Sequence, residues 1–191
     1  MSLSSPEVHW VKPTIPTILA GIDHIPVPYT DLYFIGVSGA SALVVIAVDS
    51  HIKIDGTWLL PGPLDIPCLK NAISRMLSDF PHCAGRLSYN EQKKAWQNSL
   101  VNEAVCLTVG KNTEIQVTDE FMLDPHPDVS DSIPMYMVAS DEAKKAALVR
   151  FKVIEWTKTG ETSISLSFCH VIGTAEFAIS FSKRDIHYPT R

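Results

Sequence analysis

Residues 161–174 read ETSISLSFCHVIGT, and this stretch decides the expected fold. Ile164, Leu166 and Phe168 share one parity with His170, whereas small residues, mostly serines, occupy the other parity. A period of two is typical of a β-strand with an apolar row on one face and small, polar side chains on the other. The sequence therefore predicts a strand with His170 at the end of its apolar row.

A histidine at a strand end can present its imidazole to a pocket. Gly173, three residues after His170, allows the chain to turn sharply there. With an unperturbed pKa of about 6.5, an imidazole can remove a proton near neutral pH. From the strand alone, a buried histidine with one hydrogen-bond partner is the alternative interpretation.

The preceding segment indicates a β-hairpin. Residues 148–156 read LVRFKVIEW, with apolar residues at alternate positions and charged residues partly on the other parity. TKTGE at 157–161 is a turn sequence, so we expect this strand to pair with the strand that leads to His170. Apolar residues within 174–182 suit a short helix that packs back on the hairpin.

Residues 69–80 contain the clearest helix pattern. One apolar stripe falls at i, i+3, i+4, i+7, i+8 and i+11, formed by Leu69, Ala72, Ile73, Met76, Leu77 and Phe80. Pro67 precedes the pattern and Pro81 ends it. Such a stripe must lie on a sheet or on another helix.

The remaining chain indicates short strands and loops. We expect strands at 32–35, 42–48, 50–54, 58–60, 86–89 and 104–109, a hairpin turn at Asp55 and Gly56, a surface turn at 90–97, and an exposed loop at 122–134. Short strands around at least one long helix predict an α/β or α+β domain with a mixed sheet.

The composition bounds the class of protein. With 191 residues, 46% of them hydrophobic and 19% charged, the chain suits one globular domain with a real core. The net charge is −5 and no basic stripe is present, which argues against a nucleic-acid partner. Residues 32–48 carry no charge, but glycines and serines interrupt them and no basic cluster flanks them, so we expect two buried strands, or a strand and an irregular insertion, and no membrane partner.

The cysteines predict free thiols. Cys68, Cys83, Cys106 and Cys169 form no Cys-x-x-Cys pair, and no two histidines have metal-ligand spacing. We therefore expect no metal site and a reducing, cytoplasmic compartment. Neighbours on a strand point to opposite faces, so Cys169 is interpreted as a buried structural cysteine rather than a nucleophile beside His170.

Four stretches of the sequence are informative because of the order in which they occur. They are VKPTIPT at 11–17 with Gly-Ile-Asp at 21–23, the helix 69–80 running into FPHCAGRL at 80–87, the hairpin at 147–170, and HVIG at 170–173. Together they resemble the N-terminal half of the BAHD-type acyl-CoA-dependent acyltransferases, and HVIG resembles the start of their His-x-x-x-Asp motif. The resemblance implies a single chloramphenicol-acetyltransferase-like half-domain.

The resemblance also implies a chemistry. The family's motif histidine is a general base that deprotonates an alcohol or amine, which then attacks the thioester carbonyl of acyl-CoA without a covalent acyl-enzyme. By position that role falls on His170. The implied partners are acyl-CoA, as a co-substrate rather than a bound cofactor, and a small secondary-metabolite acceptor.

Two features depart from the family. Thr174 stands where the motif has its aspartate, and a threonine cannot form the ion pair; Glu176 is the nearby alternative. The Asp-Phe-Gly-Trp-Gly motif of the family's second half has no match. We therefore expect residues 1–191 to be a truncated N-terminal domain whose catalysis is impaired. The alternative is a non-catalytic fragment or binding half-domain that self-associates through an exposed apolar face.

Residues 51–56 read HIKIDG and spell His-x-x-x-Asp-Gly literally. They precede the helix and the AGRL turn, whereas the family places its motif after both. His51, Lys53 and Asp55 share one face of an alternating strand, which indicates an ordinary solvated strand that ends in a turn. We therefore prefer His170 over His51 as the base.

Overall fold

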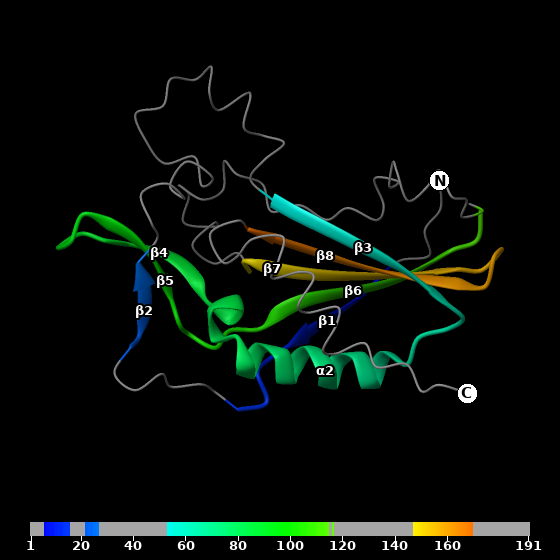
Figure 1. The fold of residues 1–191 in the computed structure, drawn as a ribbon, viewed down its shortest axis with the longest axis horizontal. Helices are drawn as coiled ribbons and strands as arrows, with labels where there is room; N and C mark the ends of the chain where they lie inside the picture. The colour runs from blue at the N-terminus through cyan, green and yellow to red at the C-terminus, as the bar shows by residue number, and fades with distance from the viewer. Residues whose placement is uncertain (1–5, 16–21, 27–52, 115, 117–146, 170–191) are drawn as a thin grey trace, which may run out of the picture.

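The structure is a computed structural model that describes residues 6–15, 22–26, 53–114, 116 and 147–169. A helix runs along one face of a five-stranded sheet, and a three-stranded sheet lies beyond one end (Figure 1). The large sheet has the order β1 (Glu7–Val11), β6 (Val105–Asn112), β7 (Val149–Trp156), β8 (Glu161–Cys169) and β3 (Lys53–Pro61). The small sheet has the order β2 (His24–Pro26), β5 (Ala95–Ser99) and β4 (Arg86–Asn90).

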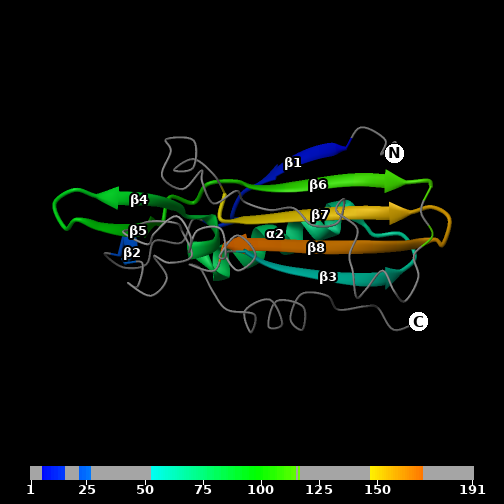
Figure 2. The same cartoon turned by 90° about the horizontal axis from the view of Figure 1, so that it is seen from above.

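The predicted hairpin is confirmed and occupies the middle of the large sheet (Figure 2). β7 and β8 pair antiparallel, with Val153 opposite Ile164. Phe151 on β7 and Phe168 on β8 are fully buried, because this face of the sheet packs under the helix. The apolar parity in the sequence therefore does mark the core face.

The opposite face of the hairpin is buried in part. Ser163 is 1% exposed, and Trp156 is fully buried on the same face. The indole Nε1 of Trp156 donates a hydrogen bond to Ser163 Oγ over 2.9 Å. Small serines on β8 thus leave room for a large indole from the neighbouring strand, and the hydroxyl satisfies its N–H.

Helix α2 (Ile66–Asp79) confirms the predicted helix but begins three residues earlier. Asp65 is its N-cap, and the carboxylate Oδ1 accepts the backbone N–H of Cys68 over 2.8 Å. Pro67 lies inside the first turn, where a missing N–H costs no intrahelical hydrogen bond. Ile73, Met76 and Leu77 are buried against the sheet.

Two predictions of turns are wrong. Asp55 and Gly56 lie within β3, which runs straight through them and pairs with β8 from Lys53 to Pro61, so tertiary pairing overrides the local turn signal. The expected surface turn at 90–97 contains only a four-residue turn at 91–94, and β5 begins at Ala95. Trp96 and Asn98 of β5 are buried, in the alternation of a strand.

The segment after β1 is hydrogen-bonded to helix α2. The Thr14 N–H donates to the carbonyl of Ser74, and the Ser74 hydroxyl donates to the carbonyl of Lys12. The Ile15 N–H donates to Ser78 Oγ over 3.1 Å. Two of the stretches that carry the resemblance, 11–17 and 69–80, therefore contact each other.

Several predicted elements lie outside the described residues. They are the strands at 32–35 and 42–48, the loop at 122–134 and the helix at 174–182. Within the part of the chain that the structure describes, no helix is long and apolar enough to span a membrane.

Candidate functional site

The candidate site is the end of the large sheet at which β8 finishes. Cys169, the last residue of β8, pairs with Lys53, the first residue of β3. β7 begins opposite Phe168, and β6, which is parallel to β7, begins at Val105. His170 follows Cys169 in the sequence and lies outside the described residues.

The FPHCAGRL segment is fixed at this same end. It forms a short 3₁₀ helix, η2 (Pro81–Ala84), and then enters β4. The carbonyl of Ala84 accepts the N–H of Glu103, and Arg86 Nη2 donates to the carbonyl of Ala104 over 2.7 Å. Because Ala104 directly precedes β6, these bonds hold the turn beside the start of β6.

Gly85 is required at the centre of this turn for space and not for its backbone angle. Its φ of −79° is open to any residue. A Cβ at this position would lie 1.9 Å from Asn98 Oδ1 and 2.9 Å from the carbonyl oxygen of Ser99. Asn98 is 4% exposed, and its Nδ2 donates to the carbonyl of His82 over 2.8 Å. The close approach of β5 to the turn thus depends on a residue without a side chain.

Arg86 acts here as a structural clamp. Its guanidinium donates through Nη1 to the Gly85 carbonyl and through Nη2 to the Ala104 carbonyl. Burial lowers the pKa of Arg86, and the negative charge of Glu103 raises it. Both of these bonds go to backbone carbonyls, so the arginine of the AGRL segment ties β4 to the start of β6.

Burial shifts the pKa of two titratable side chains on η2. Burial lowers the pKa of His82, which keeps its imidazole neutral over a wider pH range. Burial raises the pKa of the Cys83 thiol, which excludes it as a thiolate nucleophile near neutral pH. The ring of His82 meets Phe80 edge-on with centroids 6.1 Å apart. Sequence reasoning did not single out His82, although its place inside FPHCAGRL could have drawn attention to it.

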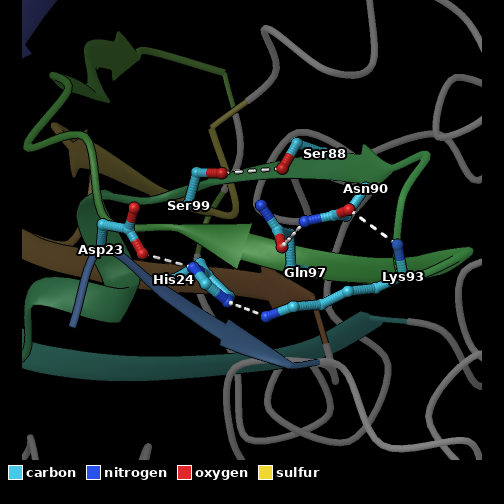
Figure 3. A network of polar contacts seen from close by, with 7 residues as sticks. All are labelled: Asp23, His24, Ser88, Asn90, Lys93, Gln97 and Ser99. Atoms are coloured by element: carbon cyan, nitrogen blue, oxygen red, sulfur yellow. Dashed lines mark hydrogen bonds and ion pairs between the residues drawn. The ribbon is translucent and has the colours of Figure 1, made fainter.

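A second polar group lies on the small sheet (Figure 3). Lys93 Nζ donates to His24 Nε2 over 3.2 Å, and His24 Nδ1 donates to the Asp23 carboxylate. The hydrogen bond from His24 lowers the pKa of Asp23. Asn90 Oδ1 accepts the Lys93 N–H, so the turn and the imidazole are held together. Asp23 and Lys93 are exposed to water, and both imidazole nitrogens of His24 are hydrogen-bonded to these charged side chains. We therefore interpret these three residues as a surface network that stabilises the small sheet.

The remaining site predictions have mixed outcomes. Cys68, Cys83 and Cys106 are free thiols, as expected. His51, Thr174 and Glu176 lie outside the described residues, as does the side chain of Cys169. Within the described ranges, no group of His, Cys, Asp or Glu has the arrangement of a metal site.

The comparisons with known proteins identify the fold. No family model matches the sequence, and no curated protein matches it significantly. Vinorine synthase has a similar structure, with a TM-score of 0.59 at 18% identity over 95% of this chain and 41% of that chain. The starter condensation domain of rhizomide synthetase RzmA is similar with a TM-score of 0.57 at 7% identity, over 84% of this chain and 37% of that chain.

The chain therefore has the chloramphenicol-acetyltransferase-like fold of acyltransferases and condensation domains, as the sequence predicted. It spans less than half the length of either of these neighbours.

Proposed function

We propose that this chain is part of an acyltransferase that moves an acyl group from acyl-CoA to a hydroxyl or amine of a small acceptor, with His170 as general base. One observation supports the proposal above the others. β8 is a central, doubly buried strand of an acyltransferase-type fold, and His170 is the residue that follows its last residue. The proposal includes acyl-CoA as the co-substrate, a small molecule as the acceptor, and a cytoplasmic location for the protein.

The proposed chemistry requires one proton to move twice. The imidazole of His170 takes the proton from the acceptor hydroxyl or amine as the oxygen or nitrogen bonds to the thioester carbonyl carbon. The tetrahedral intermediate then breaks its carbon–sulfur bond, and the leaving thiolate takes the proton from the imidazolium. A base matched to the working pH accelerates such a step by about 10²–10⁴-fold.

The described residues support this role by making the end of β8 rigid. The strand is paired on both sides, by β7 and by β3. The turn that contains Gly85 and Arg86 is clamped to the start of β6 at the same end. A base carried by a rigid strand end keeps its geometry towards a bound substrate, which is where positioning contributes to rate.

The length of the chain bears on the proposal. In the proposal, acyl-CoA and the acceptor also contact a second half of the protein. This chain spans about two fifths of the length of vinorine synthase and of the starter condensation domain. Thr174 in the aspartate position of the motif further lowers the expected rate, because the hydroxyl cannot form an ion pair. A half-domain that binds a ligand without turnover is the second candidate.

The test is an acyl-transfer assay with a panel of acyl-CoAs, in which free CoA thiol is measured as it is released. We expect slow turnover that falls at least about 100-fold in His170→Ala. His51→Ala is the matched control, since His51 lies in the literal His-x-x-x-Asp-Gly sequence, and its rate should be unchanged. Turnover that survives His170→Ala refutes the proposed base. Binding of acyl-CoA by calorimetry with no turnover favours the second candidate.

A further inference from the structure

The turn between β4 and β5 places a lysine amine against an imidazole (Figure 3). Lys93 Nζ lies 3.2 Å from His24 Nε2, and His24 Nδ1 is hydrogen-bonded to the Asp23 carboxylate. Lys93 belongs to the turn at 91–94, whereas His24 begins β2. The contact therefore joins two segments that are 69 residues apart in the sequence.

The lysine fixes the roles of the two imidazole nitrogens. A lysine ammonium only donates hydrogen bonds, so Nε2 of a neutral His24 accepts and Nδ1 carries the ring proton. Asp23 accepts that N–H, and this hydrogen bond lowers the pKa of Asp23, which keeps its carboxylate ionised. The basic nitrogen of the imidazole thus faces the amine, with a negative charge behind the ring to stabilise an imidazolium.

These three side chains have the arrangement of an activated nucleophile. Such an arrangement needs a reactive group, a base within hydrogen-bond reach and a third group that orients the base. In most lysines the protonated form dominates near neutral pH, and it does not attack electrophiles. Lys93 is exposed, and the side chain of His24 is 26% exposed. A dissolved electrophile can therefore reach the amine while the base stays beside it.

We propose that Lys93 is a modification site whose amine takes the acyl group of an acyl thioester, with His24 as base and Asp23 as positioning residue. The unprotonated amine bonds to the thioester carbonyl carbon, and His24 Nε2 takes a proton from that nitrogen. The carbon–sulfur bond then breaks, and the leaving thiolate takes the proton from the imidazolium. The products are an amide on Lys93 and one free thiol.

This reaction is separate from the proposed function. Acyl-CoA belongs to the same class of reagent, but the modification requires neither His170 nor an acceptor. It stops when each Lys93 carries one acyl group, whereas enzymatic transfer continues as long as acceptor is present. Either activity can therefore fail in an experiment without the other.

Lys94 provides an internal control in the same turn. It is exposed, as Lys93 is. Among the residues that the structure describes, the Lys94 side chain has no hydrogen bond or ion pair. Both amines therefore meet the same concentration of reagent, and the ratio of their acylation rates measures the effect of the imidazole.

The test incubates the complete chain with acetyl-CoA in the absence of an acceptor. Cleavage after glutamate yields the peptide 92–103, which contains both lysines, and fragmentation in a mass spectrometer locates the acetyl group. We expect Lys93 to be acetylated at least about tenfold faster than Lys94, a conservative value for assistance by a base. Equal rates at the two lysines overturn the proposal.

Three variants test the roles of the base and the carboxylate. His24→Gln keeps a hydrogen-bond acceptor near Lys93 but removes the base, so the rate ratio should fall close to one while the Lys94 rate stays unchanged. Asp23→Asn should lower the ratio, and Asp23→Glu should restore most of it. Far-UV circular dichroism verifies that each variant is folded. A preference for Lys93 that persists in His24→Gln, or a ratio unchanged in Asp23→Asn, overturns the assignment.

Discussion

Gly85→Ala tests the close approach of β5 to the FPHCAGRL turn. The new Cβ would lie 1.9 Å from Asn98 Oδ1, 2.8 Å from its Cγ and 2.9 Å from the Ser99 carbonyl oxygen. The φ of −79° suits alanine, so the cost is steric alone. Overpacking of this kind costs about 1–3 kcal/mol. Displacing Asn98 also removes its bond to the His82 carbonyl, which adds about 1 kcal/mol.

We therefore expect Gly85→Ala to lower the free energy of unfolding by roughly 2–4 kcal/mol. Urea unfolding followed by tryptophan fluorescence measures this, because Trp96 is buried in the same strand as Asn98. Asn98→Ala removes the nearest two clashing atoms and leaves the Ser99 carbonyl. In that background Gly85→Ala should cost about 1–2 kcal/mol less than in wild type.

Gly160→Ala is the control for this cycle. Gly160 has a φ of +76°, and a Cβ added there would meet no atom within 4 Å, so its cost is one of backbone conformation. Asn98→Ala should leave that cost unchanged. A Gly85→Ala cost below about 1 kcal/mol, or a cost that is equal in both backgrounds, refutes the steric reasoning.

Three further changes follow from the described contacts. Asp65→Ala removes the N-cap that accepts the Cys68 N–H and should cost about 1 kcal/mol by urea unfolding, whereas Asp65→Ser should restore most of it; an unchanged midpoint in the alanine variant contradicts the cap. Ser163→Ala removes the hydroxyl that accepts the hydrogen bond of the buried Trp156 Nε1 and should cost about 0.5–1.5 kcal/mol in the same assay, and equal stability of the two proteins contradicts that role. Burial lowers the folded-state pKa of His82, so only the unfolded chain gains a proton as the pH falls below about 6.5, and stability should decline from there down to the folded-state pKa. His82→Gln should flatten this part of the stability-versus-pH curve, and an equal slope in both proteins refutes the assignment.

The central hairpin could be predicted because its pattern is local and strong. The alternating apolar residues of β7 and β8 in the sequence are the same residues that lie in the hydrophobic core. The stripe from Leu69 to Phe80 likewise predicted α2, and only its start was misplaced. Pro67 looked like a boundary, although the first turn of a helix accepts proline.

β5 and the middle of β3 could not be predicted from local sequence. Asn98 is buried because it bonds to the His82 carbonyl and meets a glycine on another element, and no periodicity reports such a partner. Asp55 and Gly56 carry a strong turn signal, but continuous pairing of β3 with β8 outweighs it. In both cases the deciding partner lies elsewhere in the chain.

The candidate site was predictable in part. FPHCAGRL was recognised from a family pattern, and the structure supplies its physical reason in the space at Gly85 and the clamp of Arg86. The role of His170 stays a prediction. The buried imidazole of His82 was missed because a single histidine in a turn has no distinctive spacing.

The order of the large sheet has a consequence for synthesis on the ribosome. β3 is made early, yet its described partner is β8, and Lys53 pairs with Cys169, more than a hundred residues later in the chain. Chains emerge from the amino terminus at about 5–20 residues per second. For several seconds β3 has no partner from the central hairpin, so the nascent chain exposes a strand that chaperones or neighbouring nascent chains can reach before the sheet closes.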